Sequence, residues 1–563
     1  MLRSARLLIL ALSLGGLATG CQSADPESAE YWVGQLATAQ RKEAIRRLGE
    51  MKDKPGAIEA LVKAYDEGRN KYEIVAALSQ AGDQKAVPVL LKALEDTSEA
   101  KAGQLAATTL LDWKAGEGHS DVYLKVAANK SAPKELRYGA LQLLAEYPTA
   151  AAEPALLQIL QGDPDLQPIA FNGLAGEALG KLKSEKAIDG LIYCMWLDDH
   201  LGRNEVAKCR LALNRIGKAK VVPKAIETLE RKNRLVEARA TKFKFHVGGL
   251  VEAKSAELLG DMASPDAVEP LIAAMTKEEE PPASVMQDPK KANAFVMGSV
   301  QRAISTANAL AVIGDERAVE PLVKLAAAKD KALEYKLSAV QQLAFLGNPK
   351  AIDPLWKLFD DEPSQHDPVS QGFRVQLALA IANLMDGSDA KAMEKLDKQV
   401  DGIVAKIDGW IAEAQEKMKT EKGTARQQIA LDVKGYTDWK NNYGEAKRKL
   451  VALAECKDDP ACWGKHLAGD DIATKMLAGY RLAQMQDKRK EAMAQLITQV
   501  GEPDLAVRNV ILFGLDRVGD ASLIPQLEKA RAADAEKAAK DKRFQGAVYT
   551  LDLMIAKLSH TKG

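Results

Sequence analysis

The sequence has no surplus of charge of either sign and few aromatic side chains. Its 563 residues include 78 Lys and Arg, 78 Asp and Glu, and only 5% aromatic residues. Balanced charge excludes a protein that coats nucleic acid through a clustered basic surplus. A mean hydropathy of -0.22 is too high for general disorder and too low for a polytopic membrane protein. The composition therefore indicates a folded, water-soluble body.

Motifs that carry enzyme chemistry are also missing. The six histidines, at positions 119, 200, 246, 366, 466 and 560, are scattered singly. The chain contains no Gly-x-Ser-x-Gly, no Gly-rich phosphate loop followed by Lys-Ser or Lys-Thr, and no His-Glu-x-x-His. We therefore predict no catalytic residue, no cofactor, no metal and no small-molecule substrate.

The N-terminus has the pattern of an export signal. Arg3 and Arg6 precede an apolar run, Leu7 to Leu14, that is too short to span a bilayer permanently. We interpret residues 1–20 as a signal peptide and residues 21–31 as a short polar tether. Export from the cytoplasm also disfavours nucleic acid as a binding partner.

The end of this signal resembles the lipobox of bacterial lipoproteins. Small residues precede the cysteine in Leu17-Ala18-Thr19-Gly20-Cys21, although Ala18 departs from the usual Leu. The resemblance implies that Cys21 is diacylated and anchors the chain to the membrane of the cell envelope. Gln22 stands where Asp retains lipoproteins in the inner membrane, so the outer membrane is favoured, on its periplasmic side. An ordinary secretory signal with a chance cysteine is the alternative.

A self-similar unit fills most of the remaining chain. The segments 258–271, 310–322 and 343–355 align, and Gly314 and Gly347 stand 33 residues apart. Weaker copies occur elsewhere. The candidate turn glycines are Gly82, Gly180, Gly217, Gly260, Gly314, Gly347 and Gly519, and the prolines that open the second helices are Pro270, Pro321 and Pro354.

Each part of the unit has a physical reason. Leu337, Val340 and Leu343 recur at helical spacing upstream of the glycine and give the first helix one buried face. Glycine allows the left-handed backbone that ends a helix, and the Asp or Asn that follows it caps the next one. Proline is tolerated in the first turn because the amides there have no intrahelical partner. The unit is therefore a helix, a tight turn and a second helix.

This unit resembles the HEAT repeat, in particular the short variety of phycobilisome-lyase-like bacterial proteins. The resemblance implies an all-α solenoid, a right-handed superhelix of helix pairs, over residues 32–389 and again over 454–563. An unrelated set of helical bundles is the alternative. Deoxyhypusine hydroxylase, which has related repeats, holds iron with His-Glu pairs, but this sequence contains no His-Glu dipeptide.

Residues 390–453 interrupt the repeats with two heptad seams, which predict a long helical hairpin of about 45 Å. The first seam is Met393, Leu396, Val400, Ile403, Ile407, Trp410 and Ala414, and the second is Ile429, Tyr436, Trp439, Tyr443, Ala446, Leu450 and Leu453. Either the hairpin projects as a contact device, or its helices pack along the solenoid.

Two further groups are candidates for partner binding. A basic run with interleaved aromatics fits an anionic surface or a solvated helix face; its candidates are Arg231, Lys232, Arg234, Lys242 and Lys244. Trp410 and Trp439 lie on the hairpin. Trp356 is either exposed in the groove of the solenoid or part of its core.

Four cysteines remain besides Cys21, an even number in an oxidising compartment. We predict disulfides Cys194–Cys209 and Cys456–Cys462. A metal site is disfavoured because neither pair is Cys-x-x-Cys and no histidines accompany them.

Together these features predict a non-catalytic scaffold that binds a protein partner along its concave face. The alternative is an envelope assembly or structural factor that contacts its partners through the 390–453 hairpin. A HEAT-like lyase or oxidoreductase is a minor alternative.

Overall fold

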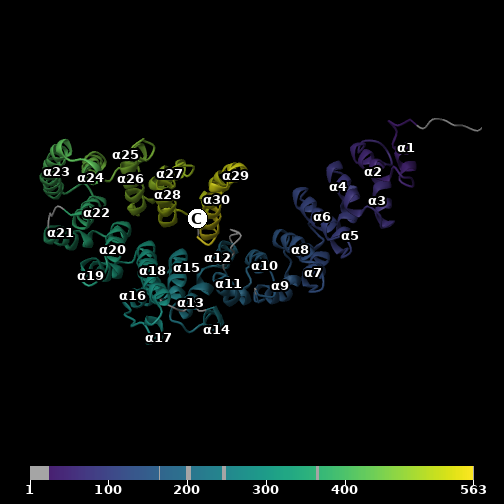
Figure 1. The fold of residues 1–563 in the computed structure, drawn as a ribbon, viewed down its shortest axis with the longest axis horizontal. Helices are drawn as coiled ribbons and strands as arrows, with labels where there is room; N and C mark the ends of the chain where they lie inside the picture. Colours follow the sequence, from purple (N-terminus) through teal and green to yellow (C-terminus); the bar gives the residue numbers. More distant parts are fainter. Residues whose placement is uncertain (1–24, 164, 198–204, 244–248, 363–366, 562–563) are drawn as a thin grey trace, which may run out of the picture. The chain divides into compact units, whose positions relative to one another are not determined.

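The computed structural model describes residues 25–163, 165–197, 205–243, 249–362 and 367–561 (Figure 1). The predicted signal peptide, residues 1–20, and the predicted lipidation site Cys21 lie outside these residues. Within the described ranges the regular elements are helices and no strand occurs, so the predicted all-α, HEAT-like solenoid is confirmed. The chain divides into two units, Met1–Leu182 with Asp199–Glu205, and Lys183–Asp198 with Val206–Gly563.

Unit 1 is a stack of helix pairs in which α2, α4, α6, α8 and α10 each pack on the next (Figure 1). Its helices are α1 (Ala29–Gln35), α2 (Arg41–Glu50), α3 (Ala57–Asp66), α4 (Lys71–Ala81), α5 (Val87–Glu95), α6 (Ala100–Asp112), α7 (Ser120–Ala128), α8 (Lys134–Glu146), α9 (Glu153–Leu160) and α10 (Ile169–Lys181).

Unit 2 continues the same pairing, and its first helices α15, α18, α20 and α22 again pack in series. Up to the hairpin its helices are α11 (Ile188–Cys194), α12 (Glu205–Ile216), α13 (Lys218–Leu229), α14 (Arg234–Phe243), α15 (Leu250–Met262), α16 (Val268–Thr276), α17 (Ala283–Met286), α18 (Pro289–Ile313), α19 (Val319–Ala327), α20 (Leu333–Leu346), α21 (Ile352–Asp361) and α22 (Pro368–Leu384). The hairpin and the C-terminal repeats follow as α23 (Ala390–Thr420), α24 (Gly423–Cys456), α25 (Pro460–Leu467), α26 (Ile472–Gln484), α27 (Arg489–Thr498), α28 (Leu505–Val518), α29 (Ile524–Lys540) and α30 (Gln545–Leu558).

The turn inside a repeat is a left-handed glycine followed by one turn of 3-10 helix. Gly82, Gly314 and Gly347 have φ of 73°, 79° and 73°, and each ends the first helix of its repeat. The Asp315 and Asn348 side chains then accept the amides of Arg317 and Lys350, which caps the 3-10 turn. Pro270, Pro321 and Pro354 are the third residues of α16, α19 and α21. Gly217, with φ of 102°, precedes α13.

Three of the predicted turn glycines have other roles. Gly180 and Gly260 lie inside α10 and α15, and the left-handed residues of those repeats are Lys183 and Ala263, with φ of 53° and 45°. Gly519 ends α28 in extended backbone, with φ of -79°. The prediction was wrong at these three positions. At Gly260 the reason is close packing, because a Cβ there would lie 3.2 Å from the Cα of Ala309.

Close approach of successive first helices is the recurring packing device. A Cβ on Gly49 of α2 would lie 2.9 Å from the Cβ of Ala77 of α4, and one on Gly139 of α8 would lie 2.7 Å from the Cβ of Ala107 of α6. In unit 2, a Cβ on Gly260 would lie 3.2 Å from the Cα of Ala309. Small residues therefore bring the backbones of this row together.

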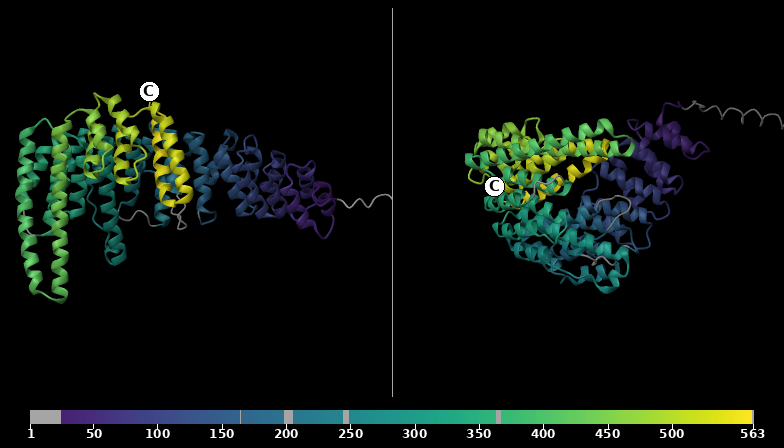
Figure 2. Two further views of the ribbon diagram at one scale, coloured as in Figure 1. Left: turned by 90° about the horizontal axis from the view of Figure 1, so that it is seen from above. Right: turned by 60° about the vertical axis from the view of Figure 1, so that its left-hand side comes forward.

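The hairpin α23–α24 is anchored at its base and free at its far end. Leu396, Val400 and Ile403 of α23 are buried, and the base of α24 packs on α22 and α26. Figure 2 shows the pair extending beyond the neighbouring helices of unit 2. None of the described helices combines the length and the apolar character that crossing a membrane requires.

We expect Gly103→Ala to destabilise unit 1 although Ala is the better helix former. The new Cβ would lie 2.6 Å from the Ala93 carbonyl oxygen and against Leu136, and such overpacking costs about 1 to 3 kcal/mol. The matched control is Gly34→Ala in α1, where no atom lies within 4 Å and a gain of about 0.5 to 1 kcal/mol is expected. Denaturant unfolding of both variants measures the signs. A stabilised Gly103→Ala protein would contradict the packing.

Candidate functional site

The first helices of the repeats line the inner side of unit 2, and its two ends face each other there. We call α12, α15, α18 and α20 the middle wall, and α26, α28 and α30 the C-terminal wall (Figure 1). Two cavities, of about 560 Å³ and about 200 Å³, are each lined by residues of both walls. The inner face of this unit is thus closed by the chain's own C-terminal repeats, not open as the sequence predicts for a concave groove.

A single arginine of the C-terminal wall joins the ends of two helices of the middle wall. The Arg517 guanidinium donates to the carbonyl oxygen of Ala311 at 2.8 Å and to that of Leu346 at 3.2 Å. These carbonyls belong to the last turns of α18 and α20, where the helix dipole favours a cation. Burial lowers the pKa of Arg517 to about 10, so the group stays charged near neutral pH.

Three aromatic rings meet beside this arginine. The ring centroids of Phe345 in α20 and Phe513 in α28 are 3.8 Å apart, and Tyr480 of α26 lies 5.6 Å from Phe345. The Arg517 guanidinium carbon lies 4.5 Å from the centre of the Phe513 ring. The closing contact therefore combines an apolar cluster with a cation held over one of its rings.

Charged groups line the rest of the closed face. Arg210 of α12 donates to Asp261 of α15 at 2.7 Å, and Lys557 of α30 pairs with Asp516 of α28 at 2.7 Å. Burial alone lowers the pKa of Arg210, but the charge of Asp261 raises it above its ordinary value. Across the walls, His560 Nε2 lies 3.1 Å from the Asn214 carbonyl oxygen.

Sequence reasoning did not select Arg517 or the three rings, although one signal marks the arginine. In aligned repeats the position two residues before the turn glycine holds Val312 and Phe345, and Arg517 stands in that apolar column two residues before Gly519. The contacts of Phe345 with Tyr480 and Phe513 join residues more than 130 positions apart, and a local pattern does not reveal such pairs.

The predicted basic segment is largely paired within the chain. Arg231 bonds to Glu237 and lies 3.5 Å from Glu252, and Lys232 pairs with Glu230 at 2.6 Å. Arg234 is exposed at the start of α14. Lys242 lies near the end of α14, and Lys244 lies outside the described residues. The described part therefore offers Arg234 alone as an exposed cation without an ion pair among the described residues.

The predicted tryptophans are divided between core and hairpin. Trp356 is 8% exposed in α21 and is covered by the Lys395 ammonium, 3.8 Å from the ring centre, so it is not available to a partner. Trp410 and Trp439 lie on the hairpin, where Tyr436 is 6.1 Å from the first and 5.4 Å from the second. Both indoles are half-buried.

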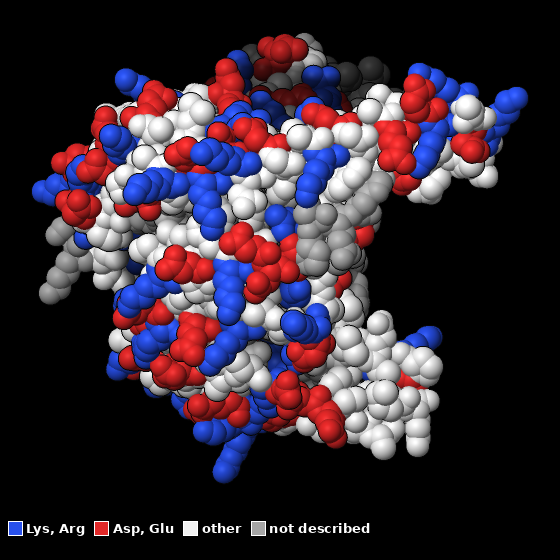
Figure 3. Space-filling view, turned by 90° about the vertical axis from the view of Figure 1, so that its left-hand side faces the viewer, with Lys and Arg blue, Asp and Glu red and all other residues white. Residues whose placement is uncertain are grey.

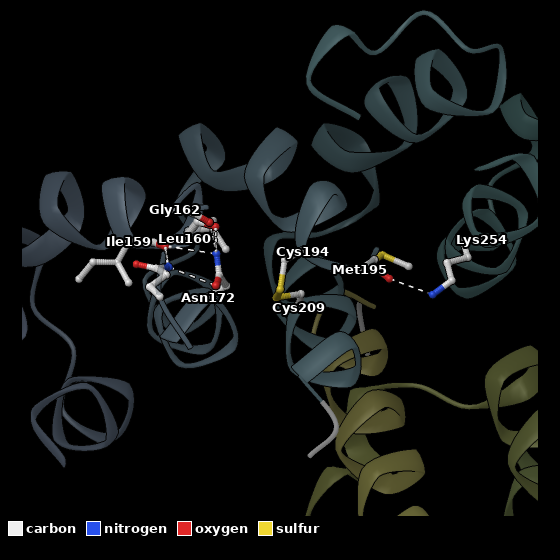
Figure 4. The surroundings of a disulfide bond; sticks show 9 residues. Ile159, Leu160, Gly162, Asn172, Cys194, Met195, Cys209 and Lys254 are labelled. Atoms are coloured by element: carbon white, nitrogen blue, oxygen red, sulfur yellow. Dashed lines mark hydrogen bonds between the residues drawn. A yellow bond between two sulfur atoms is a disulfide. The ribbon is translucent and has the colours of Figure 1, made fainter. Parts of the chain in front are cut away.

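Both cysteine pairs selected from the sequence are at disulfide distance. Cys194, the last residue of α11, joins Cys209 of α12 across 15 positions (Figure 4). Cys456 joins Cys462 across 6 positions. The residue after Cys194 is also fixed, because Lys254 Nζ donates to the Met195 carbonyl oxygen at 3.0 Å. The disulfide therefore joins α11 to α12, and the Lys254 hydrogen bond ties the end of α11 to α15.

The statement that no histidine accompanies the cysteines was wrong for one pair. His466 lies one turn after Cys462 in α25, and its ring, Cys456 and Cys462 have ligand atoms within 4.8 Å of one another. His466 Nε2 also lies 3.3 Å from Glu455. The Cys462-x-x-x-His466 spacing is the sequence signal that was missed. The sulfurs are joined to each other, and a disulfide lacks the thiolates that bind a metal.

The outer surface of unit 2 carries both signs of charge in alternation. Figure 3 shows Lys and Arg interleaved with Asp and Glu over the face that includes the hairpin. Pairs bridge successive repeats, such as Lys350 with Glu316 at 2.6 Å and Arg317 with Glu269 at 3.2 Å. This face therefore presents no single-sign field for nucleic acid.

Two family models match parts of the chain. The model for HEAT repeats matches residues 299–367, and the model for the PBS lyase HEAT-like repeat matches residues 71–96. No catalytic family is among these matches. A search of curated protein sequences finds no match.

A search of solved structures finds similarities at low identity. Importin beta, crystallised in an ammonium sulfate condition, is 10% identical with a TM-score of 0.36 over 94% of this chain and 80% of that chain. Kap121p bound to Ste12p is 12% identical with a TM-score of 0.29 over 96% of this chain. The chain spans 61% of the length of that Kap121p chain.

We expect the Cys194→Ser/Cys209→Ser variant to be less stable than the unreduced parent by about 3 kcal/mol, because the bond closes a loop of 15 residues. The Cys456–Cys462 bond closes a shorter loop of 6 residues, so the Cys456→Ser/Cys462→Ser control should lose about 2 kcal/mol. Denaturant unfolding compares them. Labelling of any of these four cysteines in the unfolded, unreduced parent would show that the bonds are absent.

A buried lysine at the base of the hairpin predicts a pH dependence. Lys449 is 6% exposed and its Nζ donates to Asn383 Oδ1 at 2.8 Å. Burial lowers its pKa to about 8, below the value of about 10.4 in an unfolded chain. Between about pH 8 and about pH 10, Lys449 is therefore neutral in the folded chain and takes up a proton when the chain unfolds. The free energy of unfolding should rise with pH over this range. The cost of burying the charged Lys449 ammonium is fully present below about pH 8.

The measurement is the free energy of unfolding across that pH range for the parent and for Lys449→Met. The variant should lose the rise, while Lys434→Met, at an exposed position of the same helix, should keep it. Equal pH profiles for the parent and Lys449→Met would disprove the assignment.

Proposed function

We propose that this chain is a non-catalytic scaffold that binds a protein partner and is held at the bacterial cell envelope by lipid on Cys21. One observation carries the binding role: the inner face of unit 2 already binds a protein surface, its own C-terminal repeats. That contact uses helix ends, aromatic rings and charged side chains, which are the groups that a foreign protein also offers.

The architecture supports this role energetically. Stacked repeats form an extended surface, and each repeat is stabilised by contacts with its neighbours. The residues exposed on the inner row can therefore differ from one such protein to another and match the partner. Binding then rests on many modest contacts and needs no deep catalytic pocket. Cavities at the closed face leave room for water or for displaced side chains.

A second candidate is an envelope assembly factor that contacts its partner through the hairpin. The observation that favours it is the free end of α23–α24, which extends beyond its neighbours and exposes Leu431. The half-buried Trp410, Tyr436 and Trp439 lie next to one another on this arm. Amphipathic aromatic residues of this kind are enriched at protein interfaces.

Crosslinking in intact cells, followed by mass spectrometry, distinguishes the two contacts. One variant replaces residues 408–440, whose ends face each other as Asp408 and Lys440, with a short Gly-Ser turn. This removes the hairpin tip together with Trp410, Leu431, Tyr436 and Trp439 and keeps the packed base. The other, Asn308→Cys/Asn509→Cys, is locked across the smaller cavity, which both residues line. Loss of partners only on locking supports the inner face, and loss only on shortening supports the hairpin. Retention in both variants contradicts both contacts.

The anchor has its own test. Cys21→Ser should abolish incorporation of a fatty-acid analogue and release the chain from the membrane fraction, because acyl chains supply stable attachment. Cys456→Ser/Cys462→Ser is the matched control and should keep the label. A labelled Cys21→Ser protein would contradict lipidation at this residue.

A further inference from the structure

The closing contact has a defined chemistry on the side of the middle wall. The last turns of α18 and α20 aim the carbonyl oxygens of Ala311 and Leu346 at one guanidinium. Helix C-termini carry partial negative charge, and the planar guanidinium presents several donors in a fixed fork, so one arginine satisfies both ends. Lysine offers a single ammonium and matches this arrangement less well.

Glycine stands where the guanidinium enters. A Cβ on Gly314 would lie 2.7 Å from Arg517 Nη2, and a Cβ on Gly347 would meet the end of the Gln484 side chain. The two turn glycines therefore shape an entrance as well as a left-handed backbone. Phe345, one position before the end of α20, supplies the apolar surface next to it.

On the C-terminal wall, two residues of one helix make the closing contact. Phe513 and Arg517 are four residues apart on α28, on the same face of the helix, and the guanidinium covers the phenyl ring. The phenyl ring meets Phe345, and the guanidinium meets the two carbonyl ends. A helix with phenylalanine and arginine at this spacing can make both the ring contact and the hydrogen bonds to the carbonyl groups.

We propose that this part of the middle wall is a receptor for a protein helix that carries phenylalanine and arginine four residues apart. In the closed state the receptor is occupied by α28 of the same chain, and a partner helix with the same pair takes its place when unit 2 opens. The inference rests on the proposed function and specifies the chemistry of the partner.

The rest of the closure is suited to exchange. Cavities of about 560 Å³ and about 200 Å³ separate the walls, and their lining includes Arg210, Asp261, Asp516 and Lys557. Interfaces that are polar and incompletely filled resemble those between domains that move relative to each other. Contacts between neighbouring first helices, in contrast, are too close to admit a Cβ at Gly260 without a shift.

The first experiment measures opening in the full-length chain. Asn308→Cys and Asn509→Cys, both exposed and both lining the smaller cavity, are joined by a short bis-maleimide. Arg517→Ala and, from the other wall, Phe345→Ala should slow crosslinking several-fold, and Arg517→Lys should have an intermediate effect. Circular dichroism shows which variants are folded.

The matched control is Arg489→Ala. Arg489 also donates to helix-end carbonyls, those of Val518 and Gly519 at 2.7 Å each, but both partners lie within the C-terminal repeats. Its loss should leave the crosslinking rate unchanged. Crosslinking at the parental rate in both folded Arg517→Ala and Phe345→Ala would overturn the closing role of the pair.

The second experiment tests the receptor with a fluorescent peptide of residues 504–520, which contains α28. Fluorescence anisotropy should show at least tenfold tighter binding to the Arg517→Ala chain than to the parent or to Arg489→Ala. Peptides carrying Phe513→Ala or Arg517→Ala should lose binding. The receptor assignment would be overturned if the Arg517→Ala chain did not bind the peptide, or if it bound the substituted peptides equally well.

Two further outcomes are informative. An open variant that dimerises supports the same receptor if the peptide dissociates the dimer, and contradicts it if the dimer persists. A chain that binds the peptide but captures no partner in cells would refute the proposed scaffold function and leave the receptor standing.

Discussion

The close approach of successive first helices is the constraint on which the rest of the structure depends. Gly49, Gly139 and Gly260 allow backbone contact that any larger side chain would prevent. When one row of helices packs more tightly than the other, a stack of pairs bends toward the tight row. In unit 2, α28 and α30 lie opposite α15, α18 and α20.

Closure then follows from the chemistry of helix ends. Each first helix ends with carbonyl groups that lack an intrahelical partner, and on the inner face these ends accumulate side by side. A cation from the returning repeats neutralises two of them at once. Burial opposes this arrangement, as the lowered pKa of Arg517 shows, and the two carbonyl hydrogen bonds offset that cost.

Much of the fold could be predicted because its determinants are local. The glycine, the capping Asp or Asn, and the proline lie within a few residues of one another, and the heptad positions Leu396, Val400 and Ile403 are buried in α23. The error at Gly260 has a physical origin, since a glycine that permits close packing and one that permits a turn look alike in sequence. Lys183 and Ala263 adopt the left-handed backbone without glycine.

The candidate site was harder to predict because its contacts are remote. Arg517 meets carbonyls that are 171 and 206 positions away. Whether repeats curl far enough to meet depends on small angles summed over many pairs, which no single motif encodes. His466 was missed for a related reason: an i, i+4 neighbour of Cys462 becomes relevant only once a turn has brought Cys456 to the same place.

The ion pairs between successive repeats have a consequence for how such a chain grows. Lys350 with Glu316, Lys125 with Glu95, and Lys85 with Glu59 each join a cation of one pair of helices to an anion of the preceding pair. A duplicated pair of helices therefore arrives with both halves of its junction already complementary. Lengthening by whole copies keeps the total charge near zero, so the even count of acids and bases is a property inherited from the unit.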